Sequence, residues 1–355
     1  MEAASNEADE LGATCPTPLS DYKEVVLAHG SGGKLSQRLL QSVVLPRFQN
    51  ELLAPLHDGA IFELDGSRVA FSTDSYVVSP IFFPGGDIGK LAVHGTVNDL
   101  AMCGATPHYL SVAFILEEGL PMADFRRVVQ SMQAAASEAG VLLITGDTKV
   151  VDRGKADKLF INTAGLGLLR ARVNIQPSRA QPGDKIIING PIAVHGIAIM
   201  SVREGLEFET QIASDTAPLN SLVKLILDEC EDIHVLRDPT RGGITSALSE
   251  IAQAAGVGML LDEGQIPISE EVKGACEILG LDPLYVANEG KFLTILPAAE
   301  ADRVLASMRA HPLGRAAAII GEVTADHPGY VLMKTRVGGI RVVDMLSGEQ
   351  LPRIC

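Results

Sequence analysis

The stretch that decides the fold reads STDSYVVSPIFFPGGDIGKLAVHGTVNDLAMCGATP and spans residues 72–107. A run with strand character enters it at 68–73, and a longer apolar run follows the PGGD turn at 88–103. A second strand-like run comes directly afterwards, at 108–116. Because strand-like and helix-like patterns alternate over so short a distance, we expect a mixed α/β fold.

The alternation continues along the rest of the chain. Residues 122–140 predict an amphipathic helix, because Phe125, Val128, Val129 and Met132 recur at the spacing of one helix face. Further strands are expected at 141–144, 159–165 and 185–189, and further helices at 219–230 and 244–255. The periodicity does not distinguish parallel from antiparallel pairing, so both arrangements stay open.

The sequence divides into four segments. Its acidic start is rich in small residues, which is typical of a disordered extension. The stretch RARVNIQPSRAQPGD, residues 170–184, is rich in proline and polar residues and predicts a linker. We therefore expect a disordered extension, an N-terminal domain, a C-terminal α/β domain and a mobile tail, at 1–23, 24–171, 172–345 and 346–355.

The composition excludes several classes of protein. With 29 lysines and arginines against 44 aspartates and glutamates, a net charge of −15 and no tryptophan, we expect no nucleic-acid partner. No apolar run approaches the roughly 18 residues of a membrane span, and no signal peptide is visible, so we expect a cytoplasmic protein without a membrane partner. The five cysteines form no CxxC pair, which argues against a structural zinc site and a disulfide framework.

Five aspartates stand at predicted strand ends or turns. They are Asp58, Asp74, Asp99, Asp147 and Asp238. Each by itself is explained by the frequent use of aspartate in caps and turns. Together they predict a site for a nucleotide bridged by Mg2+, because this cation binds one or two carboxylates together with substrate phosphates.

Glycine-rich turns precede three of the predicted helices, at 30–34, 85–87 and 241–243. Glycines at a helix N-terminus let backbone N–H groups approach an anion closely, which favours phosphate binding. None of the three is a P-loop or a GxGxxG turn. The turns therefore indicate phosphate binding without identifying the nucleotide.

The chain ends in LPRIC, residues 351–355, so its last residue is a cysteine. Terminal segments are usually mobile, and we expect this tail to touch no core element. Prenylation is excluded, because that modification requires the cysteine four residues from the end. A terminal thiol on a mobile tail suits a carrier that visits a partner's active site as well as its own.

At Asp99 the pattern becomes specific. The run from Asp99 to Pro107 resembles the DxxxxGAxP signature of the ATP-binding superfamily of aminoimidazole ribonucleotide synthetase, selenophosphate synthetase, thiamine monophosphate kinase and the hydrogenase maturation factor HypE. From about His29 to Cys355 the chain resembles the HypE family within that group. The matching stretches are HGSGGK (29–34), residues 72–107, TGDTKVV (145–151), DPTRGG (238–243), ANEGK (287–291) and PRIC (352–355).

The resemblance implies a fold and a reaction. The fold is α/β (α+β), a two-domain PurM-like fold whose N-terminal sheet pairs with a twofold mate in a homodimer, with ATP in a cleft near that interface. In the reaction, the terminal cysteine receives a carbamoyl group from the carbamoyltransferase HypF. ATP then drives dehydration of the S-carboxamide to an S-cyanate, and the HypC–HypD complex accepts the cyanide for the iron centre of [NiFe]-hydrogenases.

The chemistry of that reaction agrees with the residues present. An amide oxygen is a poor leaving group, so its removal calls for conversion to a phosphate ester with ATP, assisted by Mg2+. The resemblance guides the assignment of Cys355 as carrier, Glu289 as proton acceptor and Lys149 as a nearby cation. Expected contacts to ATP are Asp58, Asp74, Asp99, Asp147, Lys90, Asn98, Gly146 and Thr148, and expected ligands of Mg2+ are Asp58, Asp74, Asp99 and Asp238. His94 and His195 are expected at most to support these groups.

Two alternatives stay open. One is a sister enzyme of the same superfamily, a selenophosphate synthetase or a small-metabolite kinase. Selenophosphate synthetases have a reactive cysteine or selenocysteine near the first glycine-rich loop, where this chain has Ser31. The other is a non-catalytic thiol carrier whose ATP site only regulates partner docking.

Overall fold

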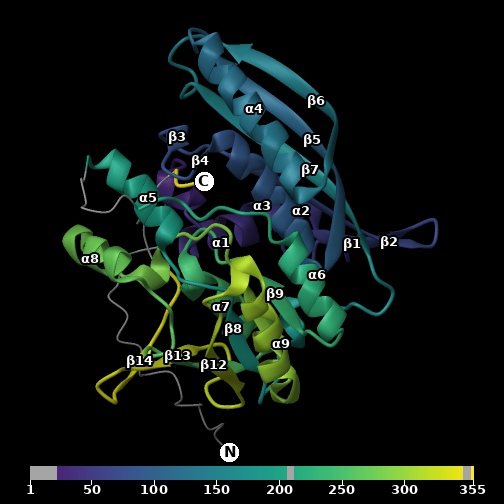
Figure 1. Ribbon diagram of the computed structural model, residues 1–355, viewed down its shortest axis with the longest axis vertical. Coiled ribbons are helices and arrows are strands. Elements are labelled where there is room, and N and C mark those ends of the chain that lie inside the picture. The colour runs from purple at the N-terminus through teal and green to yellow at the C-terminus, as the bar shows by residue number, and fades with distance from the viewer. Residues whose placement is uncertain (1–21, 206–211, 347–352) are drawn as a thin grey trace, which may run out of the picture.

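The computed structural model describes residues 22–205, 212–346 and 353–355. All but the last two residues of the extension predicted at 1–23, and residues 347–352 of the predicted tail, lie outside them. Over the described ranges, the strands form a five-stranded sheet, a seven-stranded sheet and a two-stranded ribbon (Figure 1). Among the same residues, no helix combines the length and apolar character needed to span a lipid bilayer.

The N-terminal half builds the smaller sheet. Its strands are β1 (Ala60–Leu64), β2 (Ser67–Tyr76), β5 (Ala105–Glu117), β6 (Leu142–Val151) and β7 (Leu159–Leu169). They lie in the order β1-β2-β7-β5-β6, and every neighbouring pair is antiparallel except β5 and β6. The ribbon of β3 (Phe82–Phe83) and β4 (Gly86–Asp87) leads into α3 (Ile88–Met102), which packs on this sheet, and α4 (Met122–Ala139) packs on α3 (Figure 1).

The C-terminal half builds the larger sheet and most of the helices. Its strands are β8 (Lys185–Ile188), β9 (Val235–Arg237), β10 (Gly258–Asp262), β11 (Leu293–Leu296), β12 (Ala318–Thr324), β13 (Val331–Lys334) and β14 (Ile340–Val342). Its helices are α5 (Val194–Arg203), α6 (Asn220–Glu229), α7 (Gly243–Ala255), α8 (Glu270–Leu279) and α9 (Ala298–Ala310). The strand order is β14-β13-β10-β12-β8-β11-β9, and only β10 and β13 pair in parallel among these strands.

Short helical pieces complete the described chain. Before the first sheet, α1 (Lys34–Leu39) continues through a π-helical turn (Leu40–Val44) into α2 (Leu45–Phe48). Single 3-10 turns lie at Leu27–Gly30, Pro177–Arg179, Pro283–Tyr285 and Pro312–Gly314. The α/β alternation predicted from the sequence is confirmed, with each predicted strand and helix inside or within a residue or two of an observed one.

The helix α3 positions one of the site residues. Its N-terminus is capped by Asp87, whose carboxylate accepts a hydrogen bond of 2.9 Å from the backbone N–H of Lys90. Within α3, only Lys90 and Asp99 are not fully buried, which makes it a helix of the protein core. Asp99 is therefore a carboxylate held by a rigid, deeply buried element.

Three predicted positions of aspartates were wrong. Asp74 lies inside β2, Asp99 inside α3 and Asp147 inside β6, whereas Asp58 and Asp238 do lie in loops. The reason is the length of the elements: β2 stays paired with β7 as far as Tyr76, and β6 stays paired with β5 as far as Val151. The strand predicted at 141–144 therefore runs through the whole TGDTKVV stretch.

The stretch predicted to be a linker is packed rather than loose. Val173 and Ile175 are fully buried and join a core cluster with Met102 of α3 and Leu222 of α6. The largest core cluster likewise combines residues of both halves, such as Val93 and Ile197. Residues 170–184 therefore separate the two sheets in sequence without separating their cores, and the two-domain division stays a prediction.

Candidate active site

Three carboxylates from distant parts of the chain meet at one point. Asp58 precedes β1, Asp99 lies on the last turn of α3, and Asp238 follows β9. One carboxylate oxygen from each lies within 4.8 Å of the other two. Three of the five predicted aspartates therefore form one cluster, and we refer to them as the carboxylate cluster.

Burial makes negative charge on this cluster costly. It raises the pKa of Asp58 and of Asp99 well above the ordinary range, and that of Asp238 to about 6, and the neighbouring carboxylates add to the rise. Two groups oppose this effect: Arg237 donates to Asp58 over 2.9 Å, and Ser72 donates to Asp99 over 2.7 Å. The cluster is therefore short of positive charge.

The carboxylate cluster fits a divalent cation. The Oδ2 atom of Asp58 is buried and has no hydrogen-bond partner among the described residues, although buried carboxylate oxygens normally have one. Hard cations such as Mg2+ prefer carboxylate oxygens and would neutralise the mutual repulsion of the three groups. The oxygen donors and the unpartnered atom both suit such an ion.

A second charged group adjoins the cluster. Glu289 is buried, and this burial, followed by the charges of Asp238 and Asp74, raises its pKa well above the ordinary value. Asp74 also has a raised pKa owing to burial, opposed first by Arg241. No hydrogen bond to the Glu289 carboxyl group occurs within the described ranges. A protonatable carboxyl group and a guanidinium group thus lie beside the carboxylate cluster.

The terminal cysteine is docked next to these groups in its own subunit. The backbone N–H of Val77 donates to an oxygen of the terminal carboxylate of Cys355 over 3.1 Å, and that of Ser79 donates to the carbonyl of Arg353 over 3.3 Å. Ile354 is only 2% exposed, and Cys355 packs against the largest core cluster. The expectation that the tail touches no core element was wrong: its last three residues insert between α5 and the β3–β4 ribbon (Figure 1).

Docking changes the chemistry of the thiol. Desolvation raises the pKa of Cys355 to about 12, while Arg241 opposes the rise and Glu289 adds to it. The pKa of Arg241 is in turn raised, first by Cys355. The docked sulfur therefore stays protonated at neutral pH when it carries no group, and it lies within electrostatic reach of Glu289 and Arg241.

Two glycine-rich loops pack against each other beside the site. Gly32 has a φ of +77°, and a Cβ there would lie 2.6 Å from the Cβ of Arg241. Gly242 has a φ of +76°, and a Cβ there would lie 2.8 Å from the carbonyl oxygen of Gly32. Both positions need glycine for conformation and for space. The loops therefore hold Arg241 in place between them and the N-terminus of α7.

An apolar cavity of about 700 Å³ opens beside Asp58. Its walls come from residues 37–60, from Phe71 and neighbours on β2, and from the outer side of α7 near Ile251. Cavities of about 300–1,000 Å³ are usual for ligand sites. This one is large enough for the base and ribose of a nucleotide whose phosphates reach the carboxylate cluster.

Several predicted residues are not brought to this site within one chain. Asp147, Thr148 and Lys149 lie exposed on β6, where Lys149 pairs with Asp147 over 2.8 Å. The register places four residues in one row across the sheet, namely Asp74, Thr163, Val112 and Gly146. Three strand spacings, about 14 Å, therefore separate this part of β6 from Asp74.

Two further predicted residues have other partners. The side-chain amide of Asn98 donates to the carbonyl of Ala217 and accepts from the N–H of Leu219, so it ties α3 to the segment before α6. Lys90 lies on the first turn of α3 and donates to the carbonyl of Gly85 over 3.3 Å. Asp99 lies nine residues further along the helix, about 13 Å away. Neither side chain joins the site.

Sequence reasoning missed the two arginines of the site. Arg237 pairs with both Asp58 and Glu250, and Arg241 faces Cys355 and Asp74. A signal for Arg241 was present, because it belongs to the DPTRGG stretch. Nothing local in the sequence pairs Arg237 with a carboxylate 179 positions earlier; only the fold does.

Comparison with known proteins identifies the relatives of the chain. Residues 56–169 match the family "AIR synthase related protein, N-terminal domain", and residues 181–334 match "AIR synthase related protein, C-terminal domain". A carbamoyl dehydratase HypE of Cupriavidus necator is 55% identical over 330 residues, which cover 93% of this chain and 94% of that protein.

Solved structures agree in fold. A HypE structure in complex with ATP is 51% identical, covers 94% of this chain and 100% of that one, and superposes with a TM-score of 0.79. A HypE–HypF complex contains a chain that is 47% identical, with coverage of 87% and 99% and a TM-score of 0.83. Identity of this extent over nearly the whole length, together with both family matches, places the chain in the HypE family of carbamoyl dehydratases, within the AIR synthase related proteins.

Proposed function

We propose that this chain is an ATP-dependent carbamoyl dehydratase that converts an S-carboxamide on Cys355 into an S-cyanate, supplying cyanide ligands for the iron centre of [NiFe]-hydrogenases. The observation that carries the proposal is the docked thiol, which lies within electrostatic reach of Glu289, Arg241 and Asp74, beside the carboxylate cluster. The carboxylate cluster proposed to bind the phosphates, the proposed proton acceptor Glu289 and the reacting sulfur of Cys355 thus lie in one site.

The carboxylate cluster supports binding of the phosphates of ATP through Mg2+. Asp58, Asp99 and Asp238 would hold the ion, and the unpartnered oxygen of Asp58 favours this assignment. When bound, Mg2+ supplies charge neutralisation for the phosphoryl group in transfer. The adjoining apolar cavity would take the base and ribose. Asp74 and Arg241 act electrostatically on both Asp238 of the cluster and Cys355 of the tail.

Glu289 is the proposed proton acceptor. Transfer of the γ-phosphoryl group to the carboxamide oxygen turns that oxygen into part of a phosphate leaving group. The C–O bond then breaks with departure of phosphate, and each of the two steps releases one N–H proton as the C≡N bond forms. A carboxylate is a better base when its pKa is raised, and the Glu289 oxygens are not engaged by hydrogen bonds from described residues. Arg241 can balance the charge on the departing phosphate.

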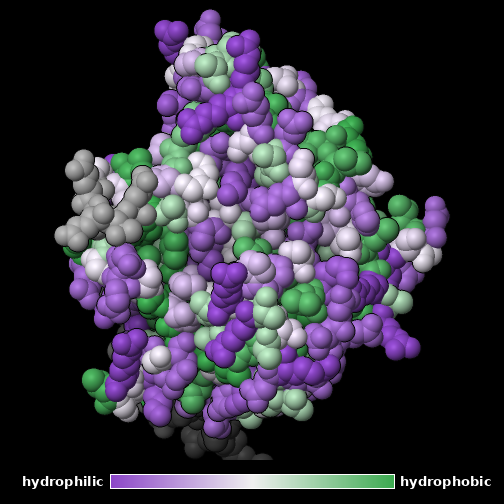
Figure 2. All heavy atoms as spheres, in the orientation of Figure 1, coloured by the Kyte–Doolittle hydropathy of each residue, from purple (hydrophilic) through white to green (hydrophobic). Residues whose placement is uncertain are grey.

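A homodimer would bring β6 to the site. This edge strand exposes apolar side chains at both ends, Leu142, Ile144 and Val150 among them, and the outer face of the same sheet exposes Tyr109 and Leu168. Figure 2 shows apolar side chains gathered at the edge where Figure 1 draws β5 and β6. We propose that β6 of one subunit carries Asp147, Thr148 and Lys149 to the nucleotide of the other.

The remaining partners follow from the relatives. A HypE has been solved in complex with HypF, and we propose a HypF-type carbamoyltransferase as the donor for Cys355. A HypC–HypD-type complex is the proposed acceptor of the cyanide, and the cytoplasm is the proposed location. Because the docked Cys355 is held inside its own subunit, the tail must leave this site to meet either partner.

The test is a mass measurement on the isolated protein. Chain carbamoylated on Cys355 is incubated with ATP and Mg2+, and we expect its mass to fall by one water, with ADP and phosphate formed in equal amounts. Cys355→Ala, which cannot carry the group, is the control and should show no such change. A carbamoylated tail that keeps its mass while ATP binds would favour the alternative, a thiol carrier that ATP only regulates.

A further inference from the structure

Helix α5 presents two side chains to the backbone of the docked tail. The Nε2 atom of His195 lies 3.0 Å from the carbonyl oxygen of Ile354. Two turns further along α5, the Nη2 atom of Arg203 lies 2.8 Å from the carbonyl oxygen of Arg353. Neither residue belongs to the carboxylate cluster or touches the sulfur, so the reaction described above gives them no role.

The backbone oxygens of the tail accept hydrogen bonds from two sides, from α5 and from residues 77 and 79. Residues 77 and 79 donate to backbone oxygens of residues 355 and 353, in the order of an antiparallel pair. His195 supplies the donor for the carbonyl between them. Each of the last three residues therefore accepts a hydrogen bond through a backbone oxygen, and these contacts read the backbone of the tail rather than its side chains.

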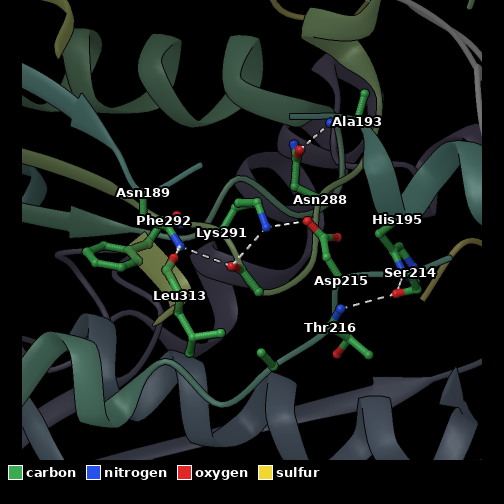
Figure 3. Close-up of polar contacts among 12 residues, drawn as sticks. Asn189, Ala193, His195, Ser214, Asp215, Thr216, Asn288, Lys291, Phe292 and Leu313 are labelled. Carbon is green, nitrogen blue, oxygen red and sulfur yellow. Dashed lines mark hydrogen bonds and ion pairs between the residues drawn. The ribbon is translucent and has the colours of Figure 1, made fainter. Parts of the chain in front are cut away.

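The ring of His195 is oriented by a hydrogen bond that does not involve the tail. A carbonyl only accepts, so Nε2 carries the proton, and Nδ1 accepts from the hydroxyl of Ser214 over 2.8 Å. That hydroxyl in turn accepts from the backbone N–H of Thr216 over 3.3 Å (Figure 3). His195 is fully buried, and this burial lowers its pKa to about 4, so the ring is neutral at pH 7.

The same segment supports the loop that carries Glu289. Between Ser214 and Thr216, Asp215 forms an ion pair with Lys291, two residues after Glu289 (Figure 3). A Cβ at Gly290 would lie 2.3 Å from the carbonyl oxygen of Asp215, so the two segments are in tight backbone contact. The donor that holds the tail and the loop that holds the carboxyl group are thus fixed to each other.

We propose that α5 is a latch for the tail, in which His195 and Arg203 are positioning residues that hold the carbonyls of Ile354 and Arg353 and thereby place the sulfur of Cys355 against Glu289. Loss of either donor shifts the tail toward the undocked state. The docking part of this proposal stands independently of the reaction; only its consequence for dehydration rests on the proposed function.

Alkylation of the unmodified thiol tests the latch. Iodoacetamide is applied to His195→Leu and Arg203→Met, and modification of each cysteine is followed by peptide mass spectrometry. A buried hydrogen bond to a charged donor is worth about tenfold in an equilibrium, and we expect Cys355 to react about tenfold faster in Arg203→Met and several-fold faster in His195→Leu. The buried Cys103, Cys230 and Cys276, at most 5% exposed, report on general loosening and should keep their wild-type rates.

Conservative and matched variants sharpen the result. His195→Gln keeps a donor near the position of Nε2, and Arg203→Lys keeps one charged donor, so both should alkylate more slowly than their apolar counterparts. Arg309 donates to the carbonyl of Ala317 over 2.9 Å, far from the tail in sequence, and Arg309→Met should leave Cys355 unchanged.

Two outcomes overturn the latch. One is a wild-type alkylation rate of Cys355 in both His195→Leu and Arg203→Met. The other is equal acceleration of Cys355 and of the three buried cysteines, which would mean that His195 and Arg203 support the fold in general. The proposed function is judged separately, by the loss of water from carbamoylated wild-type chain: if alkylation responds as expected and that loss is absent, the latch stands and the dehydratase assignment falls.

Discussion

At the scale of single residues, Glu289 separates the two half-reactions. In the proposed function, carbamoyl transfer takes place in the partner's active site, where Glu289 is absent, whereas dehydration needs a base within reach of the carboxamide nitrogen. We expect Glu289→Gln to accept the carbamoyl group and bind ATP normally, because Gln keeps the shape of the buried side chain. Formation of the S-cyanate should slow by about 10²–10⁴.

A single-turnover assay on the carbamoylated tail measures that rate directly. The matched control is Glu322→Gln, which changes a carboxylate of β12 that pairs with Lys185 over 2.6 Å, outside the site. Dehydration by Glu289→Gln within a few-fold of wild type would leave Glu289 as a structural residue. The base would then have to be sought among the remaining carboxylates of the site.

The carboxylate cluster predicts two effects of removing one of its charges. The metal-free protein should become more stable, and the stabilisation by Mg2+ with ATP should be lost. Without a cation, the buried charges of Asp58, Asp99 and Asp238 repel one another, as their raised pKa values indicate. Asp99→Asn removes one charge while its amide oxygen can still accept from Ser72. We expect the metal-free variant to gain about 1 kcal/mol in free energy of unfolding at pH 7 to 8, and to lose the added stability that Mg2+ with ATP gives the wild type.

Thermal unfolding with and without Mg2+ and ATP measures both effects. A gain of this size corresponds to roughly 2–4 °C in Tm for a chain of a few hundred residues. Thr163→Val changes a buried polar residue of β7 that donates to the carbonyl of Ala92 in α3, outside the cluster, and controls for altered packing. A destabilised Asp99→Asn that still gains the full wild-type stability from Mg2+ and ATP would contradict a cation site at this cluster.

Much of the site could be predicted residue by residue, and the gaps have physical causes. Asp58, Asp99 and Asp238 were predicted to share one site, and the structure brings them together. The prediction was possible because each aspartate stands in a short stretch with glycine, a composition that suits metal-bridged phosphate binding. Arg237 could not be paired in advance, since its partner depends on how β9 packs against the start of β1. Asp147 and Lys149 were placed in the same site, but one chain keeps them about three strands away.

At the scale of elements, the periodicity of apolar residues predicted the helices that pack on the core. It did not predict strand segments that are defined by backbone pairing. The helix at 122–140 was predicted because Phe125, Val128, Val129 and Met132 repeat at helix spacing, and it is observed as α4. The strand β6 was predicted over only four residues, since TGDTKVV has few apolar residues and gains its strand geometry from backbone pairing with β5. The docked tail escaped prediction because its backbone hydrogen bonds, the ion pair of Arg353 with Asp157 and the burial of Ile354 all involve residues distant in the sequence.

The docked tail predicts its own pH dependence. Burial raises the pKa of the Cys355 thiol to about 12, against an ordinary value near 8.5 for an exposed thiol. The docked state therefore holds a proton that the undocked state loses first. The stabilisation of docking is complete below about pH 8.5 and declines as the pH rises toward 12.

Alkylation of Cys355 between pH 7 and 10 checks this sign. The thiolate fraction of a fixed thiol of raised pKa would rise tenfold per pH unit throughout this range, whereas release of the tail to a thiol of ordinary pKa makes the rate level off near pH 9 to 10. The Arg203→Met variant, whose tail is released more often, should react faster at pH 7 and should reach the same limiting rate at a lower pH than the wild type. A profile that rises without levelling in both proteins would show that the tail stays docked.

At the scale of the whole molecule, the proposed homodimer predicts that two subunits share one site. Within one chain the reacting sulfur, Glu289 and the carboxylate cluster meet, while Lys149 lies exposed on the edge strand β6. The apolar side chains exposed along this edge and the adjoining sheet face suit burial against a second copy. No sequence pattern distinguishes such a shared site from one built in a single chain, because both need the same residues.

Complementation between two inactive variants tests whether Lys149 of one subunit serves the site of the other. If the Lys149 that serves each site comes from the partner subunit, a heterodimer of a Lys149→Ala chain and a Glu289→Gln chain contains one site with both wild-type residues and one with both substitutions. Each parent homodimer should be slowed by about 10²-fold or more, and the heterodimer, isolated through two different affinity tags, should recover roughly half of the wild-type dehydration rate.

The mirror experiment pairs a chain carrying both substitutions with a wild-type chain. If the site is shared, every site in that heterodimer has one defect, and activity stays low. Recovery in the second heterodimer and not in the first would place Lys149 and Glu289 of the same chain in one site, and a monomer with full activity would remove β6 from the mechanism altogether.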